Sequence, residues 1–238
     1  MKHRVMIIMA VGLVAVASSA YGKQFGAWGT PVNAESITGA SSDLNTPYND
    51  GCPIQSPDGL SLYIASNRPG TLGGQDIWVA HRSAVGDPWG APEHLDAPVN
   101  SAADDFCPSP TRGRRLFFVS ARSGGCGGPD IYVTRQRLDG SWRDPRNLGC
   151  AINSAAGEAS PSFFRAADGH AVLYFSSSRA GGFEAGGTDS DIYYSVDFGA
   201  AQLAPELNTA SEDSRPNVRK DGLEVVFDST RAGGLGGP

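Results

Sequence analysis

Four carboxylates recur at one position of a long repeat in this chain of 238 residues, and they are the first candidates for chemistry. Each follows an Asn by five residues and precedes a Pro by three: Asp50, Asp105, Glu158 and Asp213. If the repeats surround an axis, this spacing brings the four acids to the mouth of a central channel. An acidic ring there would focus the electric field and attract a cation or a basic peptide. The alternative is a set of solvated loop acids that accept hydrogen bonds from nearby backbone N–H groups.

A second set of charged residues frames a Gly-rich loop in each repeat. An Arg ends one apolar run and an Asp begins the next: Arg68 and Asp76, Arg122 and Asp130, Arg179 and Asp191, with Arg231 in the last repeat. We expect the Arg and the Asp of one loop to form an ion pair. We expect the repeated Asn to cap the turn into the next strand: Asn45, Asn100, Asn153 and Asn208. Repetition in every unit favours a structural role over catalysis, because an active site needs one constellation.

The four Cys suit an oxidising compartment. Cys52 and Cys107 hold the same repeat position, and Cys126 and Cys150 belong to two loops of one unit. Of the three connectivities, we favour Cys126 with Cys150 and Cys52 with Cys107. We expect no metal and no cofactor. Zinc sites need paired C-x-x-C or His ligands, and calcium-binding Gly-Asp repeats stack in tandem, whereas these loops occur once in about 54 residues.

The elements that must position these residues follow from the repeat. Successive Asn lie 55, 53 and 55 residues apart, and each unit contains short β-branched and aromatic runs between turn residues. One strand lies at the Pro, a second ends at the Arg, a third begins at the Asp, and a fourth begins near Trp89 or Trp142. A four-stranded antiparallel unit buries both faces only when neighbours stack around an axis. We therefore predict an all-β propeller, here an incomplete ring of about four blades, with a solenoid as the alternative.

Domain boundaries follow from the same pattern. A basic start, apolar residues 5–17 and small residues up to Ala20 predict a signal peptide over residues 1–20. Residues 21–238 are the repeats, with units near 45–99, 100–152, 153–207 and a truncated 208–238. Residues 28–44 resemble the start of a fourth strand, because Trp28-Gly-Thr-Pro matches Trp89-Gly-Ala-Pro. We expect this strand to complete the last blade and close the ring.

The repeated S-x-R-x-G-G-x-G-G-x-D-I-[WY] pattern resembles the TolB-type, WD-repeat-like β-propeller repeat. It is carried by SNRPGTLGGQDIW from Ser66, SARSGGCGGPDIY from Ser120 and a looser copy from Ser177. The resemblance implies an exported or periplasmic propeller that acts mainly as a binding or scaffolding module. In that family a C-terminal peptidoglycan-binding domain often follows.

The net charge and the predicted signal peptide limit the classes of partner that we expect. The formal net charge is −6, and we find no Lys/Arg cluster after the N-terminus, so we expect no nucleic-acid partner. The chain is expected to be exported, periplasmic or extracellular, without stable membrane insertion after signal cleavage. We therefore expect a non-enzymatic scaffold for a protein or cell-envelope partner. The alternative is a carbohydrate-active or hydrolytic propeller in which two channel carboxylates serve as acid and base.

Overall fold

The repeated apolar runs form antiparallel strands in the computed structural model, which describes residues 30–183 and 189–233. The residues from Asn33 onward belong to one unit, and the following description concerns that unit. The signal segment predicted at 1–20 and Trp28 lie outside the described residues. Within the described ranges, no helix reaches the length and apolarity needed to cross a bilayer.

The strands form three four-stranded sheets and a two-stranded sheet. Blade 1 contains β1 (Asp50–Gln55), β2 (Ser61–Ser66), β3 (Asp76–His81) and β4 (Glu93–His94). Blade 2 contains β5 (Asp105–Pro110), β6 (Arg115–Ser120), β7 (Asp130–Arg135) and β8 (Arg146–Asn147). Blade 3 contains β9 (Glu158–Arg165), β10 (Ala171–Ser177), β11 (Asp191–Val196) and β12 (Gln202–Leu203). Blade 4 contains β13 (Asp213–Val218) and β14 (Val225–Ser229).

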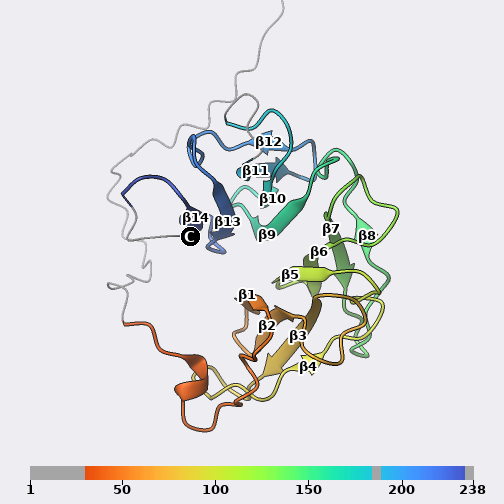
Figure 1. Ribbon diagram of the computed structural model, residues 1–238, viewed down its shortest axis with the longest axis vertical. Coiled ribbons are helices and arrows are strands. Elements are labelled where there is room, and N and C mark those ends of the chain that lie inside the picture. Colours follow the sequence, from red (N-terminus) through yellow and green to blue (C-terminus); the bar gives the residue numbers. More distant parts are fainter. Residues whose placement is uncertain (1–29, 184–188, 234–238) are drawn as a thin grey trace, which may run out of the picture. The chain divides into compact units, whose positions relative to one another are not determined.

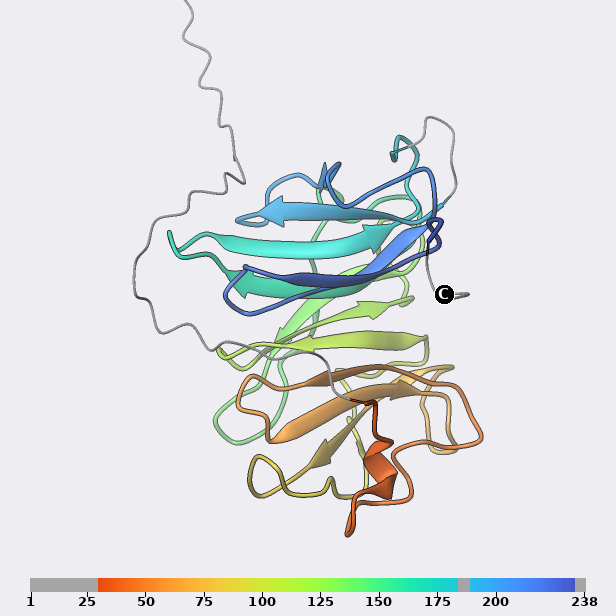
Figure 2. The ribbon, with the colours of Figure 1, turned by 90° about the vertical axis from the view of Figure 1, so that its left-hand side faces the viewer.

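The predicted propeller fold is confirmed. Each blade is an antiparallel meander in sequence order, as the hydrogen-bonded pairs show. The first strands of successive blades contact one another, β1 with β5, β5 with β9 and β9 with β13. Figure 1 shows these four strands lying toward the centre, with the later strands of each blade farther out. Figure 2 shows the sheets of successive blades face to face.

The core lies between the blades, and β6 shows why. Successive side chains of a strand point to opposite faces of its sheet. Leu116 and Phe118 pack into the cluster shared with blade 1, whereas Phe117 and Val119 pack into the cluster shared with blade 3. All four are fully buried. A strand with both faces covered needs a continuous apolar run rather than an alternating one, and this explains the sequence LFFV.

The Gly-rich loops lie against the backbone of the next blade. A Cβ added to Gly73 would lie 2.2 Å from the carbonyl oxygen of Ala103, and one added to Gly127 would lie 2.4 Å from Cα of Ala155. Such distances do not occur for real side chains. The glycines therefore permit close contact between neighbouring blades, which gives the repeated G-G a structural reason.

The segment before blade 1 differs from the prediction. Residues 30–44 contain no strand within the described part of the chain; a short 3₁₀ turn, η1 (Ala34–Ser36), begins at Asn33, whose side chain accepts a hydrogen bond from the N–H of Glu35. Leu44 packs with Ala80 and Trp89 of blade 1. This capped turn and its contacts with blade 1 replace the predicted strand over this range.

Candidate functional site

The four repeated carboxylates are buried in ion pairs and are not a free acidic ring. Their side chains are 0–10% exposed, and each accepts a hydrogen bond from the Arg that lies two residues after the second strand of its own blade. The pairs are Asp50 with Arg68, Asp105 with Arg122, Glu158 with Arg179 and Asp213 with Arg231, at N–O distances of 2.6–3.0 Å. The prediction of a cation-attracting or peptide-attracting ring was therefore wrong, because the charges are already neutralised locally.

Blade 2 shows how this pair is built. Nη2 of Arg122 donates to Oδ1 of Asp105 (2.7 Å) and to the carbonyl of Val99 (2.6 Å), while its Nε donates to Oγ of Ser120 (2.7 Å). The second oxygen of Asp105 accepts from the N–H and the hydroxyl of Ser101. Both carboxylate oxygens are therefore occupied, and the pair ties the first strand to the second and to the connection from the preceding blade.

The same contacts set the acidity of the carboxylates where a shift is resolved. Burial raises the pKa of Asp50, but hydrogen bonds from Ser66, Thr46 and Arg68 outweigh it, and the net pKa lies below the usual value. Asp213 follows the same balance of burial against hydrogen bonds from Arg231, Ser229 and Thr209, and its pKa is also lowered. These groups are held in the ionised form, which does not suit a proton donor in acid catalysis.

The Asp at the start of each third strand closes its own Gly-rich loop and does not pair with the loop's Arg, so that predicted ion pair was wrong. Asp76 accepts a hydrogen bond from the N–H of Leu72 and lies 2.6 Å from Nε2 of His94. Asp130 accepts from the N–H of Cys126, and Asp191 accepts from the N–H of Phe183. Burial raises the pKa of Asp191, partly opposed by that hydrogen bond.

The repeated Asn also has a different partner from the one predicted. Oδ1 of Asn100 accepts from the N–H of Ile77, and its amide donates to the carbonyl of the same residue. Asn153 holds Ile131 in the same way, and Asn208 holds Ile192. These Asn therefore form hydrogen bonds with the third strand of the preceding blade and do not cap the following strand. Asn45 has no preceding blade among the described residues, and it is exposed.

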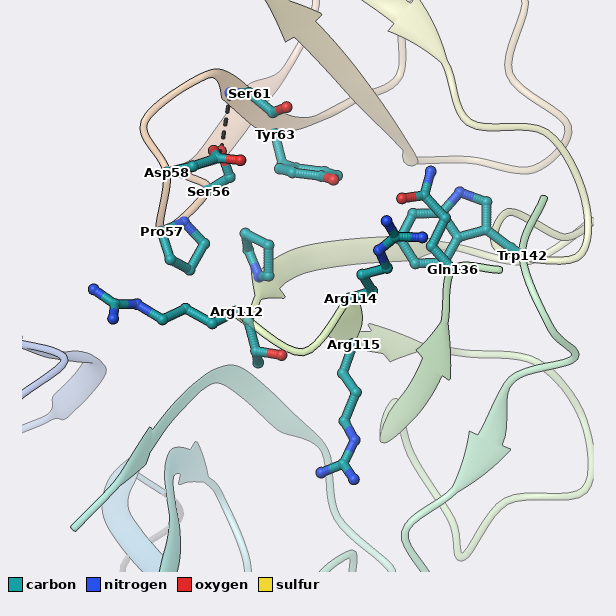
Figure 3. A pocket seen from close by; sticks show the side chains of 12 residues that line it. Ser56, Pro57, Asp58, Ser61, Tyr63, Arg112, Arg114, Arg115, Gln136 and Trp142 are labelled. Atoms are coloured by element: carbon teal, nitrogen blue, oxygen red, sulfur yellow. Dashed lines mark hydrogen bonds between the residues drawn. The ribbon is translucent and has the colours of Figure 1, made fainter. Parts of the chain in front are cut away.

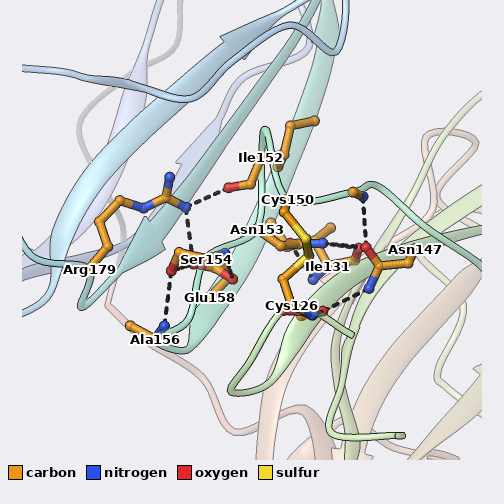
Figure 4. Close-up of a disulfide and its surroundings, with 12 residues drawn as sticks. Cys126, Ile131, Asn147, Cys150, Ile152, Asn153, Ser154, Ala156, Glu158 and Arg179 are labelled. Carbon is orange, nitrogen blue, oxygen red and sulfur yellow. Dashed lines mark hydrogen bonds and ion pairs between the residues drawn. A yellow bond between two sulfur atoms is a disulfide. The ribbon is translucent and has the colours of Figure 1, made fainter. Parts of the chain in front are cut away.

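Both predicted disulfides are present. Cys126 and Cys150 join two loops of blade 2, with a Cα–Cα distance of 5.6 Å. Figure 4 shows this disulfide beside Asn147 and Asn153, with the ion pair of Arg179 and Glu158 in the next blade close by. Cys52 and Cys107 join blade 1 to blade 2, with a Cα–Cα distance of 4.9 Å. The described residues contain no free Cys.

The central pocket is formed by a different position of the repeat, the residue just before the Pro. This residue is a bulge in the first strand of every blade and has a left-handed backbone: Cys52 (φ 47°), Cys107 (φ 46°), Ser160 (φ 50°) and Arg215 (φ 53°). Bulges re-aim side chains and are frequent near functional sites. All four line a cavity of about 710 Å³ between the first strands of the four blades.

The cavity wall changes in character around the axis. The disulfide of Cys52 and Cys107 forms one part, and Ser160 lies beside it, with its hydroxyl 3.5 Å from Sγ of Cys107. On the blade 4 side, Nη1 of Arg215 lies 2.8 Å from Oδ2 of Asp228, and both side chains are substantially exposed. Asp228 is the only carboxylate in the described lining.

Sequence reasoning missed this position because it searched for residues that repeat. The available signal was the reverse: at the residue before the Pro, the four units carry Cys, Cys, Ser and Arg, whereas the Pro itself and the acid three residues before it are kept in every unit. The Arg–carboxylate pairs hold each blade without this position, although in blades 1 and 2 its two Cys also join the blades through a disulfide.

Comparisons with known proteins give the fold a context. No family model matches the chain, and no curated protein matches its sequence. An α-L-arabinofuranosidase from Lactobacillus brevis is similar in structure, with a TM-score of 0.51 and 11% identity over 76% of this chain. A thermostable family-43 glycoside hydrolase has a TM-score of 0.46 and 14% identity, covering 74% of this chain and 64% of its own. This chain spans 65% of the length of the Lactobacillus enzyme.

This comparison corrects the expected function. We expected a non-enzymatic scaffold for a protein or cell-envelope partner, but the solved structure that is similar with a TM-score above 0.5 is an α-L-arabinofuranosidase. At this level of identity the likeness concerns the fold. The alternative, a carbohydrate-active propeller, is the one carried forward. The TolB-type resemblance remains a prediction from the repeat sequence.

Proposed function

We propose that the chain is the propeller of an exported carbohydrate-active enzyme that takes a sugar unit of a glycan into the central pocket. The observation that supports this most is the pocket, about 710 Å³, with walls from four blades and one ion pair, Arg215 with Asp228, on its blade 4 side. Ligand pockets of small molecules have volumes of about 300–1,000 Å³. The two disulfides support export, because such bonds persist in oxidising compartments.

The lining has the chemistry that a sugar needs. Ser109, Ser162 and Asn217 offer hydroxyl and amide groups, while Phe106 and Phe227 offer apolar surface. A sugar ring presents hydroxyls at its edge and C–H groups on its face, so both kinds of wall have a partner. The charged pair adds a strong acceptor and a fork of donors.

Asp228 is the carboxylate that we propose acts on the substrate. Glycoside hydrolysis uses two carboxylates that flank the scissile bond. The four repeated acids cannot supply them, because their side chains are 0–10% exposed and none of them lines the pocket. Asp228 faces the pocket with an exposed fraction of 45%, and the second carboxylate of the pair would come from outside the described lining.

The test is turnover of neutral plant polysaccharides by the full chain. Arabinan, arabinoxylan and xyloglucan are incubated with the protein, and the release of reducing ends is measured. We expect one of them to be cleaved, and Asp228→Asn to lower kcat by about 100-fold or more, as expected for loss of a catalytic acid or base. The matched control is Asp221→Asn in the same hairpin, which removes a carboxylate that pairs with Arg219 but does not line the pocket. Absence of cleavage of all three glycans, or equal losses in the two variants, would overturn the proposal.

A further inference from the structure

A second pocket lies at the opposite end of the strands from the Arg–carboxylate pairs. It has a volume of about 480 Å³ and is formed where the turns between the first and second strands of blades 1 and 2 meet. It shares no lining residue with the central pocket. Its walls come from residues 56–63 of blade 1 and from residues 110–115, Gln136 and Trp142 of blade 2.

The charge in this pocket is unlike that of the chain. One turn contributes Arg112, Arg114 and Arg115, although the whole protein has a formal net charge of −6. No carboxylate forms an ion pair with any of the three within the described residues. The run R-G-R-R from Arg112 corrects the expectation that no Lys/Arg cluster follows the N-terminus.

Two features show that this positive charge is only partly compensated. Arg115 of β6 is directly opposite Arg135 of β7, and like charges at that position destabilise a sheet. The lining contains one carboxylate, Asp58, against three Arg, and its hydrogen bonds come from the hydroxyl of Ser56 and the N–H of Leu60. A bound anion would therefore add negative charge here without displacing any ion pair.

Of the three Arg side chains, that of Arg114 extends toward the aromatic wall of the pocket (Figure 3). Figure 3 shows its guanidinium beside the Gln136 amide and the Trp142 indole, on the side of the pocket that Tyr63 occupies, whereas Arg112 and Arg115 extend away from them. Its one hydrogen bond that the structure shows is a long one, 3.3 Å from Nη1 to the carbonyl of Arg137. Most of the donor capacity of this guanidinium therefore remains for a ligand.

The remaining walls suit a sugar. The rings of Tyr63 and Trp142 are half-buried and offer apolar faces, and Ser61, Thr111 and Gln136 offer polar groups. Burial, with a smaller contribution from the negative charge of Asp58, raises the pKa of Tyr63 to about 12. Its phenol therefore remains a neutral hydroxyl that can donate a hydrogen bond at physiological pH.

We propose that this pocket binds an acidic sugar, a uronate unit of a polysaccharide, with the carboxylate on Arg114 and the ring against Trp142. Arg is suited to a carboxylate because its fork can donate two parallel hydrogen bonds. A nucleic acid would require contacts to many successive phosphates, and the basic cluster spans one turn of an acidic protein. The site goes beyond the proposed function, because it lies outside the central pocket and needs no turnover there.

The experiment measures binding of tetragalacturonate to the full chain by titration calorimetry, with the neutral maltotetraose and the oligonucleotide dT8 as comparison ligands. We expect tetragalacturonate to bind, maltotetraose to bind at least about tenfold more weakly, and Arg114→Gln to weaken tetragalacturonate by about tenfold, the loss of one charge-assisted contact. Tetragalacturonate is also expected to change the tryptophan fluorescence, and Trp142→Phe should remove most of that change.

The matched control is Arg143→Gln, which removes the same charge from an exposed residue of the same blade outside the pocket. It should leave the affinity within about twofold of the parent, as expected for a screened surface charge. Equal losses in Arg114→Gln and Arg143→Gln would show general charge attraction and overturn the site. So would absence of tetragalacturonate binding, or dT8 binding as tightly as the uronate. Melting temperatures of the variants verify that each remains folded.

Discussion

Arg122 and Asp105 lie 2.7 Å apart inside blade 2, and the same pair holds the other three blades at the equivalent position. The Asp105 side chain is fully buried, whereas Arg122 is 19% exposed and stacks near the rings of Phe118 and Tyr132. The repeat motif is therefore a device that joins the first two strands of a blade to the preceding connection. Its charges stabilise the blade, whereas the residue before the Pro lines the central pocket.

Breaking this pair should be costly. Arg122→Met leaves Asp105 as a buried charge without its partner, so we expect the free energy of unfolding to fall by about 3–5 kcal/mol in denaturant titrations. Adding Asp105→Asn to that variant should recover part of the loss. Asp221→Asn, which removes an exposed partner of Arg219, should have a much smaller effect, because solvent screens surface ion pairs. Comparable losses in the exposed and buried variants would contradict this account.

Acid should destabilise the protein through the same carboxylates. The folded-state pKa of Asp50 and of Asp213 is lowered, because their hydrogen bonds outweigh the raising effect of burial. The stability that they contribute is therefore fully present above the unfolded-state pKa of about 3.9 and is lost as the pH falls through the lower folded-state value. We expect a nearly constant urea midpoint between pH 7 and 5 and a steep fall below about pH 4. Asp213→Asn should have a shallower fall; an unchanged slope would argue against the assignment.

The buried Asn of the repeat should contribute to the free energy of unfolding through its hydrogen bonds to the preceding blade. Asn153→Ala removes the partner of both backbone groups of Ile131, and we expect a loss of about 1–3 kcal/mol for groups left unsatisfied in the interior. Asn45→Ala is the matched control, because Asn45 holds the same repeat position but is exposed. Its change should stay within about 0.5 kcal/mol. Hydrogen exchange of the Ile131 amide should accelerate in the first variant alone.

Glycine at the contact between blades should tolerate no side chain. A Cβ on Gly127 would lie 2.4 Å from backbone atoms of Ala155, so Gly127→Ala should destabilise the protein by about 1–3 kcal/mol through overpacking. Gly113→Ala provides the comparison, because nothing lies within 4 Å of the Cβ that it would add. Thermal unfolding of the two variants measures the difference, and equal midpoints would show that the two blades can separate without cost.

Both disulfides should contribute to stability. Replacing Cys126 and Cys150 together with Ser should cost about 3 kcal/mol, and replacing Cys52 and Cys107 together with Ser about 4 kcal/mol, because the second disulfide closes a longer loop, 55 residues against 24. Denaturant titrations of each double variant measure the loss. Peptide mapping of the non-reduced protein should recover both linked pairs, and labelling of any of these Cys by a thiol reagent under native, non-reducing conditions would be inconsistent with them.

Sequence alone determined the repeat and the all-β blades, and it favoured the two disulfide pairings that the structure contains. These follow from local physics: β-branched runs between turn residues form strands, and Asn recurring at 55, 53 and 55 residues sets the length of a blade. The partners of the repeated polar residues could not be found in this way. Arg68 is 8 residues from Asp76 and 18 from Asp50, and chain distance favours the wrong partner.

Tertiary structure decided that pairing, because strand register places Asp50 directly opposite Ser66, beside Arg68, while the loop's own N–H groups already occupy Asp76. It also decided where the pockets lie. One position of four blades is brought to a common axis by the bulges at Cys52, Cys107, Ser160 and Arg215. The turn of blade 2 that contains Arg114 meets the corresponding turn of blade 1. Closure around an axis joins residues more than 50 positions apart, and no local pattern contains that information.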